Sequence, residues 1–385
     1  MNRVRYLDLY RYLTVSFAIA SHAILSHGLI LKLEPSAGLF LKSLTRTATP
    51  SLIVLFGMMV EIVYARKWDA DRSSTLGALW HRVLLCYLCF VGLALVEFAV
   101  RDGGLIRLAG SVTLVLAVWN GTIFKLYMFL LAIVPLFLLV RNRYGATGLV
   151  IVPLAIFLFH LAALDPLPPL PKVGRHLGGL LFGIGDTFGP SVIHASALIV
   201  FGMLLGAVVT GRATPQAKAG FAIMLCGSVG VLGYYIAAQG FMTSLNNVAD
   251  YSQWRSQNHP AYFAFGMVVS VAILAFSYFV TLAVPQVLVR IPETVGGATL
   301  IYFFLGNVLI GFGYLLGLNT IPQISAVIAS YIVLSTVAVV LWLKYAKPSR
   351  VIVGFNDRSV SILTHAWMGA GRRWHGLGGA VRRAD

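Results

Sequence analysis

Long apolar stretches recur along the whole chain, and they constrain its fold more than any other feature. A helix that crosses a bilayer needs about 20 mostly apolar residues, and ten stretches approach or exceed that length. They run at residues 10–31, 47–64, 83–100, 123–140, 147–164, 191–210, 219–241, 261–283, 298–316 and 322–343. Of the 385 residues 58% are hydrophobic and only 11% are charged, whereas about a quarter of an ordinary soluble domain is charged. We therefore predict an all-α, polytopic transmembrane helical bundle of about ten spans.

The basic residues predict which way the chain crosses the bilayer. The run at 108–119 is too short for a span and is interpreted as an interfacial or re-entrant segment. With the N-terminus in the cytoplasm, roughly two thirds of the 29 Lys and Arg residues then fall in cytoplasmic segments. Both termini are therefore expected in the cytoplasm. The net charge of +16 is spread over these short segments, which argues against nucleic-acid binding.

The chain divides into two parts of different composition. Residues 1–345 form the predicted transmembrane domain, and residues 346–385 form a basic tail. Arginines alternate in the tail with Trp, Leu and Val, which is typical of an amphipathic helix lying on an anionic inner leaflet. Several glycines between 369 and 379 favour a disordered tail instead, and both interpretations stay open.

The first predicted helix places ionisable side chains on one face. Arg11 and His22 are eleven residues apart, which is about three turns and about 16 Å along one stripe of an α-helix. Asp8 precedes Arg11 by three residues and joins that face. Such residues cost about 2.5–3.5 kcal/mol each within a span, so they indicate function, and histidine can exchange a proton near neutral pH. Alternatively, His22 bonds a neighbouring helix and Arg11 only reaches the interface.

One predicted outer segment has the composition of a sugar-binding loop. Residues 242–260 contain Asn and Gln side chains together with Trp254 and Arg255. Amides can hydrogen-bond hydroxyls and an indole can cover the apolar face of a sugar, although a solvated connector is an equal alternative. No histidine and carboxylate spacing typical of a metal site occurs in the sequence, so we predict no metal.

The opening segment RYLDLYRYLTVSFAIASHA, residues 5–23, carries a Leu-Asp-x-x-Arg motif followed by Arg-x10-His. In these features the chain resembles the acyltransferase-3 family of integral membrane acyltransferases. The motif residues here are Leu7, Asp8, Arg11 and His22. Segments 188–208, 257–267 and 293–310 are similar to the glucan-succinylating branch of that family. Phe56 stands where the family has a serine, and Leu85 stands where it has a second arginine beside Arg82.

The resemblance implies transfer of an acyl group, acetyl or succinyl, from a cytoplasmic coenzyme A thioester to a hydroxyl. The acceptor would be a glycan or another envelope or exported molecule, and the location a bacterial inner membrane. His22 would deprotonate the acceptor hydroxyl with Arg11 and Asp8 on the same helix face, and no cofactor would be bound permanently. Guanidinium groups suit the phosphates of acyl-coenzyme A. The candidate donor-binding residues, which the positive-inside rule alone also accounts for, are Arg66, Lys67, Arg72 and Arg82.

Two other classes of function remain compatible with the sequence. A transporter or flippase for a sugar or lipid-linked glycan would also need a polar helix face and a sugar-binding outer loop. A non-catalytic membrane partner would organise an envelope assembly and would bind no coenzyme A.

Overall fold

The structure, a computed structural model, describes residues 4–101, 104–164, 172–184 and 190–381. Within these ranges every regular element is a helix, which confirms the all-α prediction. In the first half of the chain these are α1 (Arg5–Ser26), η1 (Leu29–Lys32), α2 (Pro35–Arg46), α3 (Ala48–Met59), η2 (Val60–Ala65), α4 (Arg66–Ala70), α5 (Arg72–Arg101), α6 (Gly104–Val112), α7 (Thr122–Phe159), η3 (His160–Leu164) and α8 (Lys172–Phe182). The second half has α9 (Val192–Val209), α10 (Pro215–Gln239), α11 (Phe241–Ala249), η4 (Tyr251–Arg255), α12 (Pro260–Ala283), α13 (Gln286–Gly296), α14 (Thr299–Gly313), α15 (Ile321–Leu341), η5 (Trp342–Ala346) and α16 (Arg350–Val381).

Seven helical segments of the described chain are long and apolar enough to cross a membrane. They are Pro35–Ala70, Arg72–Arg101, Thr122–Ala162, Val192–Val209, Pro215–Gln239, Pro260–Ala283 and Ile321–Ala346. An eighth results if α13 and α14, which meet at an angle of 85°, are counted as one broken span. This is consistent with a multi-pass membrane protein, while the count of ten spans and the cytoplasmic termini stay predictions.

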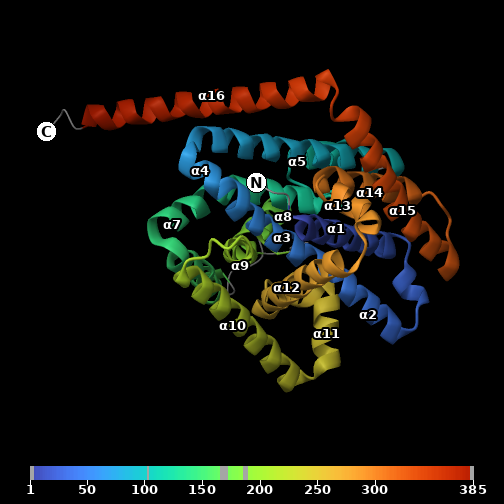
Figure 1. Cartoon of the computed structure of the whole chain (residues 1–385). Helices are drawn as coiled ribbons and strands as arrows, with labels where there is room; N and C mark the ends of the chain where they lie inside the picture. Colours follow the sequence, from blue (N-terminus) through green and yellow to red (C-terminus); the bar gives the residue numbers. More distant parts are fainter. Residues whose placement is uncertain (1–3, 102–103, 165–171, 185–189, 382–385) are drawn as a thin grey trace.

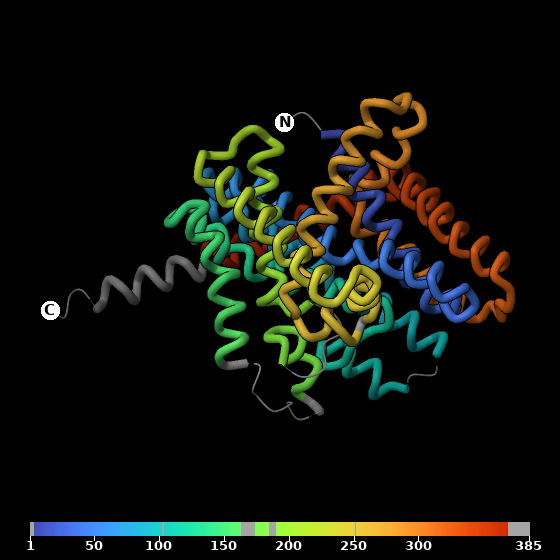
Figure 2. The backbone as a smooth tube through the Cα atoms, turned by 90° about the horizontal axis from the view of Figure 1, so that it is seen from below, coloured from blue at the N-terminus to red at the C-terminus, as the bar shows by residue number. Residues whose placement is uncertain are grey.

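Helix α1 lies in the centre of the bundle (Figure 1), packed against α2, α3, α12, α13, α14 and α15. Its position explains how a helix with Arg5, Asp8 and Arg11 can lie among apolar ones, because protein rather than lipid surrounds its polar groups. Helix α10, by contrast, lies on the outside of the bundle in both Figure 1 and Figure 2. Only 6% of the residues in its apolar stretch are buried inside the protein.

Close packing of α3 on α9 forms one wall of the interior. A Cβ atom at Gly57 would collide with the backbone of Ile199, and one at Gly202 would collide with the backbone of Val54. Glycine at both positions lets the two backbones touch, as small residues do at helix contacts inside membranes. The contact holds α3, and with it the side chains that line the candidate site, in a fixed place.

Two backbone breaks interrupt long apolar stretches. Gly145, with φ 62°, bends α7 between the spans predicted at 123–140 and 147–164, so the break falls where the sequence predicted a loop. Gly297 and Ala298 separate α13 from α14. The start of α14 is thereby placed inside the bundle, beside a cavity described below.

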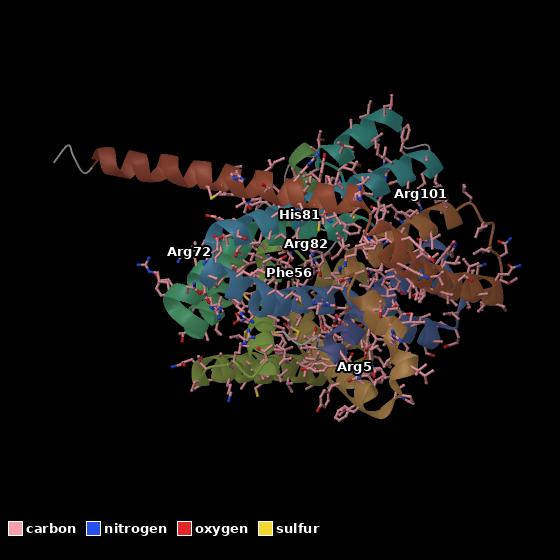
Figure 3. All side chains as sticks on the ribbon, turned by 45° about the horizontal axis from the view of Figure 1, so that its top comes forward. Arg5, Phe56, Arg72, His81, Arg82 and Arg101 are labelled. Atoms are coloured by element: carbon pink, nitrogen blue, oxygen red, sulfur yellow. The ribbon has the colours of Figure 1, made fainter. Side chains whose placement is uncertain are left out.

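The basic tail is helical from Arg350 to Val381 and packs along α5 (Figure 1). Ser359 Oγ lies 2.7 Å from His81 Nδ1, and the rings of Trp80 and Trp367 stack with centroids 5.9 Å apart. Figure 3 labels His81 beneath this helix. The division into a domain at 1–345 and a tail at 346–385 stays a prediction.

Candidate functional site

His22 is held by a single hydrogen bond to the broken-span helix. Its Nδ1 lies 2.6 Å from Asn307 Oδ1 on α14, and Asn307 Nδ2 donates to the carbonyl of Phe303 over 2.8 Å. Because the amide nitrogen is engaged, Asn307 presents its oxygen to the ring, so His22 Nδ1 carries the proton. The other ring nitrogen, Nε2, therefore has a free lone pair and can accept a proton.

His22 lines a cavity of about 510 Å³, here called the His22 cavity. Its wall comes from the C-terminal end of α1, the junction of α2 and α3, the end of α5, the segment before α7, and η4. Besides His22, the polar and aromatic side chains in the wall are Arg46, Thr49, Arg101, Arg107, Trp119, Asn120, Thr122 and Arg255. An imidazole base thus faces a basic chamber of the size of a small-ligand site.

Arg11 lines a second cavity, of about 370 Å³, toward the start of α1. Its Nη1 lies 2.8 Å from Asp8 Oδ1, and its Nη2 contacts the sulfur of Met59. The wall of this Arg11 cavity is mostly apolar and also includes Arg82 and the first residues of α14, Thr299 and Leu300. Asp8 therefore orients Arg11 toward the cavity and offsets part of its charge.

The two cavities meet at a thin partition of large side chains. Ile123 lines both of them. The ring of Phe303 lies edge-on to His22, with centroids 5.6 Å apart, and edge-on to Phe124 at 5.1 Å. Arg11 and His22, predicted to share a stripe of α1, therefore line two neighbouring cavities, and Ile123, Phe124 and Phe303 are here called the partition between them.

The predicted donor-binding residues do not converge on one place. Arg82 lines the Arg11 cavity beside Phe56 (Figure 3), whose ring packs edge-on against Tyr127. Phe56 thus adds an aromatic wall to this cavity. Lys67 and Arg72 are exposed, and Arg72 lies over the ring of Trp68 at 5.6 Å. Neither these two nor Leu85 lines the Arg11 cavity.

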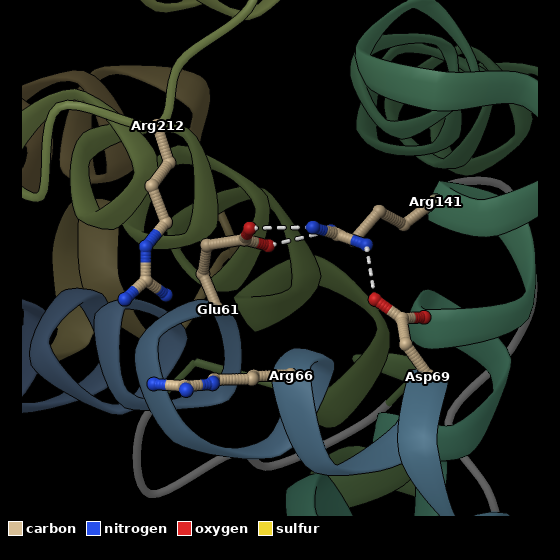
Figure 4. A pocket seen from close by; sticks show the side chains of 5 residues that line it. All are labelled: Glu61, Arg66, Asp69, Arg141 and Arg212. Carbon is tan, nitrogen blue, oxygen red and sulfur yellow. Dashed lines mark hydrogen bonds and ion pairs between the residues drawn. The ribbon is translucent and has the colours of Figure 1, made fainter. Parts of the chain in front are cut away.

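Arg66 lies in a third cavity, of about 460 Å³, at the end of the bundle that holds α4 (Figure 4). There Glu61 accepts hydrogen bonds from Arg141 Nε at 2.7 Å and from its Nη2 at 2.8 Å. Arg212 reaches the same cavity from the segment after α9. Glu61 and Asp69 balance part of the positive charge of Arg66, Arg141 and Arg212. The lining of this Arg66 cavity therefore carries both signs of charge.

Of the two residues predicted to face the acceptor, Trp254 and Arg255, only one lines a cavity. Arg255 lines the His22 cavity. Trp254 is buried instead and stacks on His259, with centroids 5.5 Å apart and ring planes 9° from parallel. It therefore anchors η4 and positions Arg255, and does not line the cavity.

Sequence reasoning missed Asn307 as the partner of His22 and three arginines of the His22 cavity, Arg46, Arg101 and Arg107. Asn307 was interpretable only as a helix-packing amide. A signal for the arginines did exist, since all three lie on the predicted outer side, where the positive-inside rule does not call for them.

Comparisons with known proteins add no assignment. No family model matches the chain, and no curated protein and no solved structure shows significant similarity to it.

Proposed function

We propose that the protein is a bacterial inner-membrane acyltransferase that moves an acyl group from cytoplasmic acyl-coenzyme A to a hydroxyl of a glycan or another envelope molecule. The observation that carries the proposal is the hydrogen bond between His22 and Asn307. It engages Nδ1 and leaves Nε2 as the proton acceptor of a ring that lines the His22 cavity. The motif in α1 on which the family resemblance rests supplies the same residue, His22.

In this mechanism His22 is a general base. Nε2 accepts the proton of the acceptor hydroxyl while the oxygen attacks the thioester carbonyl. The new ester C–O bond forms, the C–S bond breaks, and the leaving thiolate takes the proton back from the imidazolium. Such proton transfer contributes about 10²–10⁴ in rate.

The Arg11 cavity is the candidate channel for the thioester arm of the donor. Its apolar wall suits an uncharged chain, and Arg11 and Arg82 supply donors for phosphate or carbonyl oxygens. The N-terminal end of α14 adds the positive end of a helix dipole. The acyl end would reach His22 by displacing the Ile123, Phe124 and Phe303 partition.

The test is acyl transfer in inverted membrane vesicles that contain the full chain. Labelled acetyl- or succinyl-coenzyme A is supplied together with envelope glycans. A His22→Ala variant should lose about 10²–10⁴ of the transfer rate. The matched control is His27→Ala, since His27 lies on the same helix end but bonds Tyr331 Oη over 2.9 Å. Full transfer by a folded, inserted His22→Ala protein would refute the proposal.

A transporter or flippase is the second candidate, because two cavities separated by a thin partition also describe a path for a solute. The same vesicles decide between the two. Transport predicts that an unmodified sugar crosses without any thioester, whereas acyl transfer predicts labelled glycan only when acyl-coenzyme A is present.

A further inference from the structure

The His22 cavity gathers four arginines from different parts of the chain. Arg46 comes from the end of α2, Arg101 from the end of α5, Arg107 from α6 and Arg255 from η4. Among the described residues that line the cavity there is no Asp or Glu. Guanidinium groups repel one another at this density, so their convergence around one space indicates that the space takes a negative charge.

Arg101 is held between two aromatic rings. Its guanidinium carbon lies 3.5 Å from the ring centroid of Trp119 and 4.4 Å from that of Tyr314. Its buried Nε has no hydrogen-bond partner in the described part of the chain. Aromatic faces stabilise the charge through the ring quadrupole but do not use its N–H donors.

Two described carboxylates lie close to arginines of the cavity. Glu97 binds Arg107 Nη2 at 2.6 Å and the backbone N–H of Trp119 at 2.8 Å. On the other side, the hydrogen bond from the Ser252 backbone N–H, with Lys42 and Arg46 nearby, keeps the pKa of Asp250 below its usual value. Glu97 thus balances Arg107 directly, and Asp250 lies near Arg46.

We propose that the His22 cavity binds a hydroxyl-bearing acceptor that also carries an anionic group, a carboxylate or a phosphate. The acceptor would be a uronic acid or a sugar phosphate unit rather than a neutral sugar. This inference rests on the proposed acyl transfer: the arginines hold the anion, and His22 Nε2 receives the proton of the neighbouring hydroxyl. Bidentate guanidinium contacts suit carboxylate and phosphate equally, and a volume of about 510 Å³ accommodates one or two sugar units.

Binding without any acyl donor tests the anion site by itself. The full chain in phosphatidylcholine nanodiscs is titrated calorimetrically with glucuronic acid, glucose 6-phosphate and glucose. We expect at least one of the two anions to bind ~10-fold or more tightly than glucose, and this preference to shrink at high salt. Equal binding of glucose and both anions would overturn the inference.

Variants locate the anion. Arg255→Gln and Arg101→Gln should each weaken binding of the preferred anion by ~10-fold or more and leave glucose unchanged, with Arg255→Lys recovering part of the loss. The matched control is Lys32→Gln, which removes a positive charge from an exposed side chain at the same end of α1, bonded to the carbonyl of Asn319. Wild-type anion binding by both folded Arg variants would overturn the proposal.

Two further experiments, one with an anionic lipid and one that measures acyl transfer, distinguish the remaining outcomes. If phosphatidylglycerol in the nanodiscs abolishes anion binding, the cavity holds a lipid phosphate and the acceptor proposal fails. In the transfer assay, equal acylation of glucose and glucuronic acid would support the enzymatic function and contradict the proposal of an anionic acceptor. Anion binding that depends on Arg255, without any acyl transfer, would support the anion site and count against the enzymatic function.

Discussion

The two ends of α1 line cavities of different character, although one helix serves both. At its start, Arg11 and Arg82 lie in a mostly apolar wall, and Asp8 offsets the charge of Arg11 at 2.8 Å. Near its end, His22 faces four arginines, and among the described residues no acid shares that wall. The first cavity suits a long, weakly charged chain, and the second suits a compact anion.

The predicted topology makes this contrast informative. Basic residues at the cytoplasmic end of a span need no function, because the positive-inside rule already places them there. Arginines at the opposite end have no such explanation and are costly to enclose. The His22 cavity therefore carries the stronger functional signal, whereas part of the charge at the Arg11 and Arg66 cavities follows from topology.

The hydrogen bond that orients His22 gives the contrast between the cavities its largest expected effect. An Asn307→Leu variant, similar in volume, leaves Nδ1–H unpaired inside the bundle, at a cost of about 1–3 kcal/mol. We expect kcat for acyl transfer to fall about 10- to 100-fold while KM for acyl-coenzyme A stays unchanged, because the Arg11 cavity is untouched.

Asn307→Asp is the control for that variant, since its carboxylate still offers an oxygen to Nδ1–H. Its kcat should lie well above that of Asn307→Leu. Equal loss of kcat in both variants, or a KM effect as large as the kcat effect, would show that Asn307 supports packing of α1 on α14 and not the orientation of His22.

A smaller effect is expected at the other cavity. Arg82→Gln removes a charged hydrogen-bond donor worth about 1.5 kcal/mol, so KM for acyl-coenzyme A should rise about tenfold and acceptor affinity should not change. Lys67→Gln is the matched control, because Lys67 was predicted beside Arg82 in the donor set but is exposed and does not line the cavity. If both variants raise KM equally, long-range charge and not the Arg11 cavity governs donor binding.

The sequence was sufficient to predict that the chain is helical and that many of its helices are long and apolar, because these features depend on local composition and on a period of 3.6 residues. It even placed the Gly145 break between two predicted spans. It did not predict that α1 would be enclosed by six other helices, since burial by protein and burial by lipid select the same apolar side chains.

The sequence predicted several cavity-lining residues, among them Arg82 and Arg255 outside α1, but not which of them lie together. Asp8, Arg11 and His22 followed from their spacing, whereas the partner Asn307 lies 285 positions further along the chain. The four arginines of the His22 cavity come from segments that only the folded bundle brings together. Charge counts predicted the side of the membrane on which they lie but carried no information on which of them converge.

The smallest effect tests whether the Arg82 result belongs to the cavity or to a shift of α5. His81 precedes Arg82 but bonds Ser359 on α16. Ser359→Ala removes that bond and should lower the free energy of unfolding by only about 0.5–1.5 kcal/mol, measured by thermal unfolding in detergent. KM for acyl-coenzyme A should stay at the wild-type value, because α16 contacts the face of α5 that carries His81 and the cavity lies on the face that carries Arg82. A tenfold rise in KM would mean that α16 sets the position of α5, and the Arg82→Gln effect would then no longer report on the Arg11 cavity alone.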